Sequence, residues 1–263
     1  MAIFCECISS VSAAEDINCI EFAWPGTIPR AGQFFLVKPQ RTGVFLGRPI
    51  SVAGWKPQPA NGSTAFGILR FLVAKKGRGS RELCDLKPGE KAELTGPLGN
   101  YWAQAGNLAQ TESPIALVAG GIGIAPLLAL AQEFAHGRAH ELGKRPFDFY
   151  AGFRTGSFCL EDIKPRSLII ATEDGSLGKK GLITDFFNPT EYSRVFACGP
   201  QPMLKALAEI CKTSGTPCFI SVEKHMACGV GACKGCTVKT TGGNRCCCTD
   251  GPVFNAAEID FDD

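Results

Sequence analysis

The sequence predicts a β-rich N-terminal domain, a parallel α/β domain and a small C-terminal cysteine module. Short β-rich runs fill the chain up to about Trp102, and apolar strand candidates then alternate with helical stretches. Six of the fourteen cysteines fall between Cys228 and Phe254. A chain of 263 residues is long enough for about two domains with full cores. We expect domains at residues 1–102, 103–222 and 223–263.

The N-terminal part is interpreted as an antiparallel barrel or sandwich. Its runs GQFFLV at 32–37 and GILRFLVA at 67–74 are separated by turn sequences, PGT at 25–27 and KPGE at 87–90 among them. Short strands broken by glycine and proline turns are typical of antiparallel β folds.

Two stretches of this part suggest an anion site. Arg48 and Ser51 lie three residues apart, so one strand could present a guanidinium and a hydroxyl to the same anion. Farther on, Gly79 and Ser80 follow a strand, where Ser80 could cap a short helix whose free N–H groups face a phosphate. Either stretch alone also fits an ordinary turn. Together they suggest a dinucleotide laid along the barrel.

The α/β part alternates strands and helices in the manner of a parallel sheet. Strands are predicted at 115–119, 147–151, 167–171, 194–198 and 218–222, and helices at 125–134 and 201–213.

Two turns of this part lie where an open α/β sheet binds ligands. Gly121 and Gly123 form a strand-to-helix turn that could approach a pyrophosphate, with Pro126 at a plausible first helical position. The segment from Cys198 to Pro200 follows another strand at the same carboxyl edge. Both have plain structural alternatives, a tight turn in the first case and a small core cysteine in the second.

The cysteine module has the spacing of a plant-type [2Fe–2S] site. Cys228-x4-Cys233-x2-Cys236 is followed by a distant cysteine, so three thiolates come from one tight loop and the fourth from elsewhere. The fourth ligand must come from the triplet Cys246 to Cys248. Neighbouring residues of an extended segment point to opposite sides, which leaves Cys246 and Cys248 as competitors. Structural zinc is the main alternative, although the x4 gap does not fit paired C-x-x-C knuckles.

The overall composition narrows the class of protein. A formal net charge of +2 gives no basic field, so nucleic acid is an unexpected partner. The apolar run at 115–131 is shorter than the ~20 residues of a membrane span, and the N-terminus does not have the pattern of a signal peptide. We therefore expect a cytoplasmic protein that is not membrane-bound, with reduced cysteines.

The order of several motifs resembles a known family along nearly the whole chain. These motifs are GRPIS, KGRGS, TGPLGN, VAGGIGIAP, ACGPQPML, EKHMACGVGACKGC and CTDGPVF. The family is the electron-transfer subunit of NAD-linked dihydroorotate dehydrogenase, within the ferredoxin reductase superfamily. The resemblance implies a Greek-key FAD-binding barrel, an NAD-binding α/β domain and a terminal [2Fe–2S] module. It also implies a partner subunit that holds FMN and oxidises dihydroorotate, in a heterotetramer with two copies of each chain.

The resemblance assigns roles position by position. The flavin segment would be Arg48, Pro49, Ile50 and Ser51, the flavin-facing strand Leu72, Val73 and Ala74, and the pyrophosphate pair Gly79 and Ser80. Cys198 matches the catalytic residue beside the nicotinamide, and Gly121, Gly123, Gly199 and Pro200 are expected to bind cofactor. The cluster ligands would be Cys228, Cys233, Cys236 and Cys248, because C-x-DGPVF places the fourth ligand at Cys248. His225 departs from the family, in which an arginine is common.

The implied function is an oxidoreductase subunit of pyrimidine biosynthesis. Nicotinamide carries two electrons as hydride, an iron–sulfur cluster carries one, and flavin can carry either, so FAD would convert between them. Electrons from the partner's FMN would pass through the cluster and FAD to NAD+. A hydrogenase or ferredoxin:NADP+ oxidoreductase subunit and a zinc-stabilised binding module are the alternatives. Apolar Met226, Ala227 and Val230 flank the cluster loop, so we expect the partner to cover them, unless they pack on their own domain.

Overall fold

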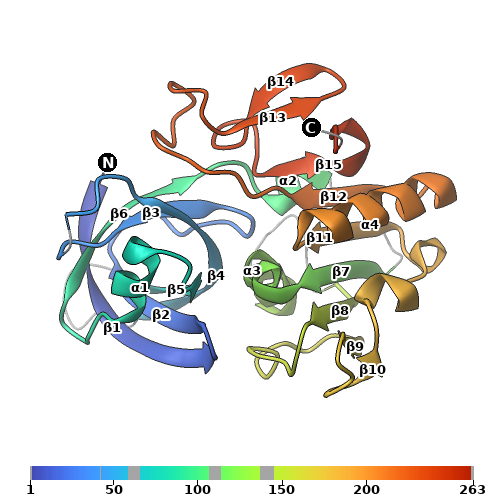
Figure 1. Cartoon of the computed structure of the whole chain (residues 1–263), viewed down its shortest axis with the longest axis horizontal. Coiled ribbons are helices and arrows are strands. Elements are labelled where there is room, and N and C mark those ends of the chain that lie inside the picture. The colour runs from blue at the N-terminus through green and yellow to red at the C-terminus, as the bar shows by residue number, and fades with distance from the viewer. Residues whose placement is uncertain (1, 42, 59–65, 107–113, 137–144, 262–263) are drawn as a thin grey trace.

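The computed structural model describes residues 2–41, 43–58, 66–106, 114–136 and 145–261. A β-barrel and an α/β domain lie side by side, and the C-terminal module lies across the top of both (Figure 1). None of the helices in these residues is long and apolar enough to cross a membrane.

The N-terminal domain is a closed antiparallel barrel with the strand order β1-β2-β5-β4-β3-β6. Its strands are β1 (Ala2–Ala14), β2 (Ile17–Trp24), β3 (Phe34–Lys38), β4 (Arg48–Gln58), β5 (Phe66–Ala74) and β6 (Lys91–Leu98). Alternate side chains of β2 point into the barrel, where Phe22, Trp24, Phe35 and Phe71 form edge-to-face pairs. The predicted runs at 32–37 and 67–74 correspond to β3 and β5. Helices α1 (Arg78–Cys84) and α2 (Trp102–Gly106) follow β5 and β6.

The α/β domain contains a parallel sheet with one antiparallel edge strand, in the order β10-β9-β8-β7-β11-β12-β15. Its strands are β7 (Ile115–Gly120), β8 (Phe147–Phe153), β9 (Ser167–Thr172), β10 (Lys179–Lys180), β11 (Arg194–Cys198), β12 (Cys218–Ser221) and β15 (Val253–Asn255). The predicted strands match β7, β8, β9, β11 and β12. The sequence did not indicate that β15, from the cysteine module, would extend this sheet.

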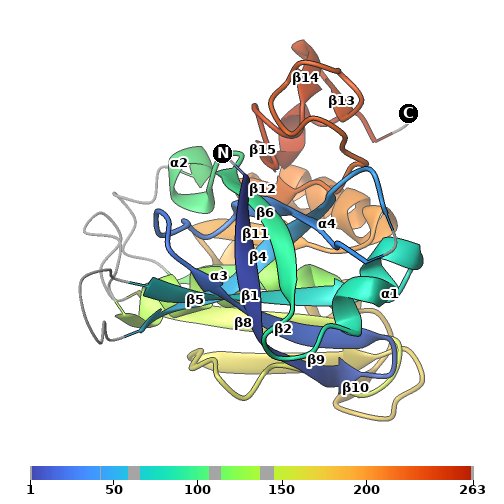
Figure 2. The same cartoon turned by 90° about the vertical axis from the view of Figure 1, so that its left-hand side faces the viewer.

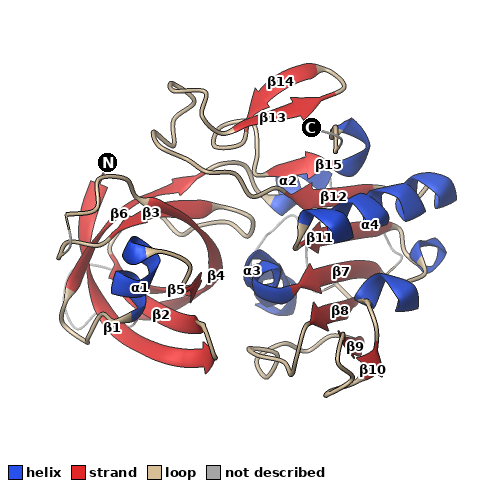
Figure 3. Ribbon diagram, viewed as in Figure 1, coloured by secondary structure: helices blue, strands red, loops and turns tan. Residues whose placement is uncertain are grey.

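The two long helices cover opposite faces of the sheet, as Figure 3 shows. Helix α3 (Ile124–His136) lies between sheet and barrel, and α4 (Gln201–Ser214) lies on the other face. Short 3₁₀ helices complete the domain: η2 (Gly121–Gly123), η3 (Ile183–Phe186), η4 (Pro189–Glu191) and, after β15, η5 (Ala256–Glu258). Pro126 is the third residue of α3 rather than the first, because the turn before it is the separate helix η2.

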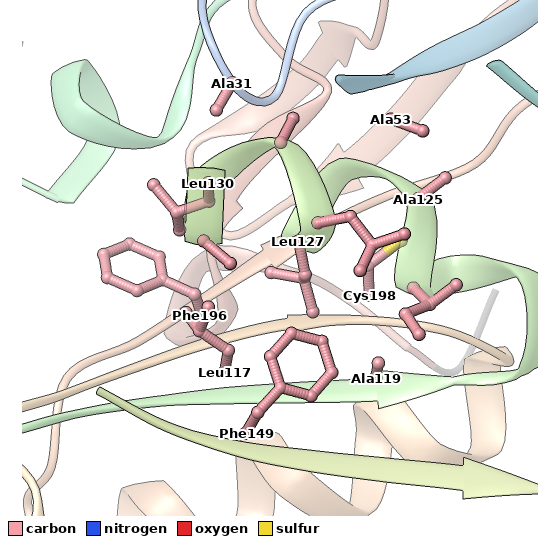
Figure 4. Packing of buried hydrophobic residues seen from close by; sticks show 14 of the residues in the cluster. Ala31, Ala53, Leu117, Ala119, Ala125, Leu127, Leu130, Phe149, Phe196 and Cys198 are labelled. Atoms are coloured by element: carbon pink, nitrogen blue, oxygen red, sulfur yellow. The ribbon is translucent and has the colours of Figure 1, made fainter. Parts of the chain in front are cut away.

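One continuous core joins the barrel to the α/β domain. Ala31, Ala53 and Leu72 of the barrel pack with α3 and with the sheet residues shown in Figure 4. Polar contacts hold the same helix in place, because Gln132 accepts from the Trp55 N–H at 3.1 Å and donates to its carbonyl at 2.7 Å. The orientation of the two domains is therefore fixed by apolar packing and by hydrogen bonds together.

The C-terminal module contains a cysteine loop and a hairpin of β13 (Thr237–Thr240) and β14 (Gly243–Cys246). Figure 2 shows this hairpin standing away from the barrel and the sheet. The module has its own small core, in which Phe34 and Leu36 of the barrel pack against the buried cysteines. A turn at Thr241 and Gly242 joins the two strands of the hairpin.

Candidate functional site

The predicted flavin segment and phosphate turn meet at one end of the barrel. Arg48 begins β4, and its guanidinium lies against the backbone of Gly79, so that a Cβ at Gly79 would overlap it. Residue 79 must therefore remain glycine for the guanidinium to reach this place. The same guanidinium also donates to the carbonyl of Leu46. A cation and the first turn of α1 are thus close together, as an anion site requires.

The prediction that Ser80 caps α1 is wrong. The helix begins at Arg78 with Gly77 as its N-cap, and Ser80 is its third residue. Its hydroxyl accepts from the Gly77 N–H at 3.0 Å and donates to the Gly77 carbonyl at 3.1 Å. The hydroxyl therefore satisfies the backbone of its own turn, and Ser80 is almost fully buried.

The other predicted flavin residues line the adjoining strands. Pro49, Ile50 and Ser51 are half-buried in β4 and pair with β3. The side chains of Leu72 and Val73 are buried in two different cores, and Ala74 is half-buried. Strand β5 also contacts the Gly121–Gly123 turn. The predicted flavin residues and the predicted cofactor turn at Gly121–Gly123 are consequently neighbours.

The two turns of the α/β domain pack backbone to backbone. A Cβ at Gly123 would overlap the carbonyl of Cys198, and one at Gly199 would lie 2.9 Å from the nitrogen of Gly120. Pro200 and Met203 close the space above Gly120. The contacts require glycine at these positions, which explains the glycine-rich sequences without a ligand, and they also bring both predicted cofactor turns to one sheet edge.

Cys198 is a buried neutral thiol at this edge. It is 1% exposed and lies beneath α3 (Figure 4). Burial raises the pKa of Cys198 well above its usual range, and the charge of Glu223 raises it further. Ser221, its partner in β12, opposes the shift by a hydrogen bond. Ser221 and Glu223 were missed by the sequence analysis, because no motif spacing links them to Cys198.

The four predicted cluster ligands are connected by backbone N–H groups. Cys233 N–H donates to Cys228 Sγ at 3.4 Å, and Gly235 N–H donates to Cys233 Sγ at 3.5 Å. Across the module, the Gly231 N–H donates to Cys248 Sγ at 3.1 Å, and the Cys248 N–H donates to Cys236 Sγ at 3.4 Å. Hydrogen bonds to sulfur are the arrangement that tunes iron–sulfur clusters, so these residues fit the group.

The conformation of the loop follows from its glycines. Gly229 has φ of +69° and Gly231 has φ of +76°, values that only glycine adopts readily. The resulting turns aim N–H groups at sulfur. Donation from Cys233 and Val230 lowers the pKa of Cys228 to about 6, which favours the thiolate that iron binds.

The remaining two cysteines of the triplet have other surroundings. Cys247 donates its thiol to the Val222 carbonyl at 3.2 Å, and burial raises its pKa to about 12. Cys246 ends β14, where its N–H donates to the Asp250 carboxylate at 2.6 Å. The prediction of an extended triplet is wrong, because residues 247–250 form a turn closed by the bond from Asp250 N to the Cys246 carbonyl.

Among the described residues, no group of three or more His, Cys, Asp or Glu side chains is arranged around a single metal ion.

The apolar residues beside the loop differ in exposure. Val230 is 62% exposed and Ala227 is exposed, but Met226 is half-buried against the core of the module. The loop itself rests on the barrel, since a Cβ at Gly229 would lie 2.8 Å from Leu36 Cδ1 and 3.0 Å from Leu98 Cδ1.

A cavity of about 440 Å³ lies elsewhere, between the distal ends of β4 and β5 and the second half of α3. Its charged residues neutralise one another, because Arg70 pairs with Glu21 at 3.2 Å and with Asp162 at 2.8 Å. None of the predicted cofactor residues lines it.

A barrel with a predicted anion turn, a parallel sheet with glycine turns at its carboxyl edge and a four-thiol module across both define an iron–sulfur flavoprotein of the ferredoxin-reductase fold. A similar chain, the NADH-dependent reduced ferredoxin-NADP oxidoreductase, superposes with a TM-score of 0.82 at 28% identity, covering 98% of this chain and 90% of that one. The cytochrome b5 reductase domain of Ulva prolifera nitrate reductase shares the fold alone, with a TM-score of 0.60 at 17% identity, over 82% of this chain and 94% of that one.

Residues 223–260 match the iron–sulfur cluster binding domain of dihydroorotate dehydrogenase B. Curated electron transfer subunits of dihydroorotate dehydrogenase B (NAD(+)) are similar over most of their length. The Clostridium acetobutylicum subunit is 38% identical over 89% of this chain and 87% of its own, and the Caldanaerobacter subterraneus subunit is 35% identical over 97% and 96%. The chain belongs to this family of electron transfer subunits.

Proposed function

We propose that this chain passes electrons between an FMN-containing dihydroorotate dehydrogenase catalytic subunit and NAD+, in a heterotetramer with two copies of each chain. The observation that carries the proposal is the set of four hydrogen-bonded thiols in the cysteine module, whose loop rests at Gly229 on Leu36 and Leu98 of a reductase barrel. Family membership agrees with this function, because the relatives are named electron transfer subunits of an NAD(+) enzyme. We also propose that the chain acts in the cytoplasm, because its fourteen cysteines would stay reduced there and pyrimidine biosynthesis is the proposed role.

Flavin, when bound, exchanges two electrons with nicotinamide as hydride and single electrons with an iron–sulfur cluster. The protein would hold FAD through the Arg48 guanidinium and the Gly79–Ser80 turn, with the 49–51 and 72–74 segments on either side. Cys228, Cys233, Cys236 and Cys248 would hold the cluster.

The residues of the α/β domain would position the nicotinamide rather than exchange protons with it. The Gly121 and Gly123 turn and the Gly199–Pro200 turn would bind NAD at the sheet edge, beside β5. Burial holds Cys198 as a neutral thiol, so it would not act as a base toward the ring. Hydride transfer requires no general acid or base from this chain.

The test is reconstitution under anaerobic conditions. The chain purified alone should contain FAD, iron and sulfide, and should oxidise NADH with an artificial acceptor. Dihydroorotate-dependent reduction of NAD+ should require both subunits. Absence of flavin and iron from the anaerobically purified chain, or full activity of the catalytic subunit with NAD+ in its absence, would refute the proposal.

A further inference from the structure

Asn100 lies at the junction of the three domains. It follows β6 of the barrel, and it makes four hydrogen bonds to the segment that leaves the cysteine module. Its backbone N–H donates to the Gly251 carbonyl at 2.6 Å, and its Nδ2 donates to the carbonyls of Asp250 at 3.0 Å and Val253 at 2.7 Å. Its Oδ1 accepts from the Val253 N–H at 2.9 Å. Both ends of the amide are therefore used.

The bonded segment connects the cluster loop to the α/β sheet. Asp250 comes two residues after Cys248, and its carboxylate accepts from the Cys246 N–H. Val253 begins β15 and pairs with Ser221 of β12. Asn100 thus joins the barrel to the turn that carries a proposed cluster ligand and to edge strand β15 of the α/β sheet.

The residue before Asn100 brings the two backbones together. Gly99 has φ of +78°, and a Cβ there would lie 2.6 Å from Pro252 Cδ and 2.8 Å from the Gly251 carbonyl oxygen. The segments 99–100 and 250–253 are in direct contact, so a displacement of Asn100 should also displace residues 250–253.

A second contact fixes the other side of the module. The cluster loop rests at Gly229 on Leu36 and Leu98, and Leu36 pairs with Pro49 of the flavin segment in the β3–β4 ladder. One residue therefore separates the cluster loop from the flavin segment. The Gly229 contact and the hydrogen bonds of Asn100 to residues 250–253, which we call the Asn100 clamp, together determine how far the cluster would lie from the flavin.

We propose that Asn100 is a positioning residue for the one-electron step between flavin and cluster. This inference rests on the proposed function. Electron transfer between two centres slows steeply as the gap between them widens, so a residue that holds both sides of the gap controls its rate. The hydride step depends on different contacts, the Gly120 to Gly123 and Cys198 to Pro200 turns, and should not depend on this clamp.

The experiment uses the full chain loaded with FAD and cluster, in Asn100→Ala and Asn100→Asp variants. NADH delivers two electrons to the flavin as hydride, followed by absorbance, and one of these electrons then passes to the oxidised cluster, followed by rapid freeze-quench electron paramagnetic resonance. We expect flavin reduction at the wild-type rate and appearance of the reduced-cluster signal slowed by about tenfold or more. The aspartate keeps the acceptor for Val253 but faces two carbonyls with an oxygen, so it should also slow the step.

A readout independent of electron transfer is hydrogen exchange at the Val253 amide, which should be faster in Asn100→Ala, with and without cofactors, because the alanine removes the acceptor of this N–H. Asn188→Ala is the matched control, because it removes a surface asparagine whose hydrogen bonds to described residues lie within its own turn. If Asn100→Ala does not fold, Leu98→Ala loosens the other contact of the module and should slow the same step.

An unchanged rate of cluster reduction in a folded, iron-loaded Asn100→Ala protein would overturn the inference. Equal slowing of flavin reduction and cluster reduction would also overturn it, because the effect would then be general. A wild-type chain without iron or a reduced-cluster signal would instead overturn the proposed function, so the two failures are distinguishable.

Discussion

At the residue scale, we expect flavin binding to depend most on the side chain of Arg48. Its guanidinium lies on Gly79 beside the first turn of α1. Arg48→Ala removes a charge-assisted contact, so we expect the dissociation constant for FAD to rise by a factor equivalent to roughly 1.5–3 kcal/mol. Equilibrium dialysis followed by absorbance measures it. Arg81→Ala, an exposed arginine of the same helix, should retain flavin. Equal retention by both variants would contradict the assignment.

The cysteine triplet gives a second prediction at this scale. Cys248→Ser should lose the cluster, because Cys248 alone of the triplet has its sulfur and its N–H bonded to the ligand loop. Cys247→Ser should keep full iron, since its thiol faces the Val222 carbonyl. Iron analysis and electron paramagnetic resonance of the dithionite-reduced protein test both. Full occupancy in Cys248→Ser together with loss in Cys246→Ser would reverse the choice.

The sequence predicted the types and spacing of the residues at these sites, but it predicted few of the contacts that they make. The loop spacing indicated three ligands, and alternation along a strand narrowed the fourth to two. Alternation failed for a physical reason, since β14 ends at Cys246 and a turn follows. The contacts of Leu36, Leu98 and Asn100 with the module join residues more than a hundred positions apart. No local pattern records such pairs, although the TGPLGN motif contains Asn100.

At the element scale, the long periodic segments were predictable because a buried parallel strand and an amphipathic helix each leave a continuous pattern. β7, β8 and α3 agree with their predicted ranges within about two residues. β15 was not predictable, because three residues carry too little periodicity, and its pairing with β12 depends on the rest of the module. Ser80 was misplaced for a related reason: a helix start depends on backbone geometry that one hydroxyl does not determine.

The buried carboxylate of Asp148 connects three elements near the amino-terminal ends of the parallel strands. Asp148 of β8 accepts from Arg166, which precedes β9, at 2.9 Å and 2.5 Å. It also accepts from the hydroxyl of Tyr192, which follows η4, at 2.9 Å. Burial alone would raise the pKa of Asp148, but these donors outweigh it and lower the pKa below its ordinary value.

Because the pKa of Asp148 is lowered in the folded protein, the free energy of unfolding should depend on pH in the acidic range. The carboxylate contributes stability above the ordinary aspartate pKa of about 3.9, and this contribution is lost as pH falls through the lower folded pKa. Asp148→Asn should lower the free energy of unfolding at pH 7 by about 1–3 kcal/mol. The gap to wild type should narrow below about pH 4. Urea unfolding across pH measures it, with exposed Asp85→Asn as control. A constant gap would contradict the pKa argument.

At the scale of the whole molecule, the cluster module lies where a protein partner could contact it. It lies across the barrel and the sheet (Figure 1). Its loop exposes the apolar side chains of Ala227 and Val230. A second exposed group lies close by, since Gly47 rests on the same Leu36 as Gly229, and Phe45 and Leu46 precede Gly47. Phe45 is 87% exposed. Exposed apolar groups around a redox loop are what a protein partner would cover.

Val230 tests whether the catalytic subunit docks at this loop. Val230→Asp should weaken the complex, because a partner surface that covers the loop would have to desolvate the new carboxylate. The isolated chain should keep its visible spectrum, as the side chain of Val230 is 62% exposed and contributes little to its own core. Val11→Asp is a matched control with the same 62% exposure on β1 of the barrel. Association is measured by analytical ultracentrifugation of the mixed subunits. A complex of unchanged affinity in Val230→Asp would place the partner elsewhere, and a lost spectrum would show that the side chain supports the loop itself.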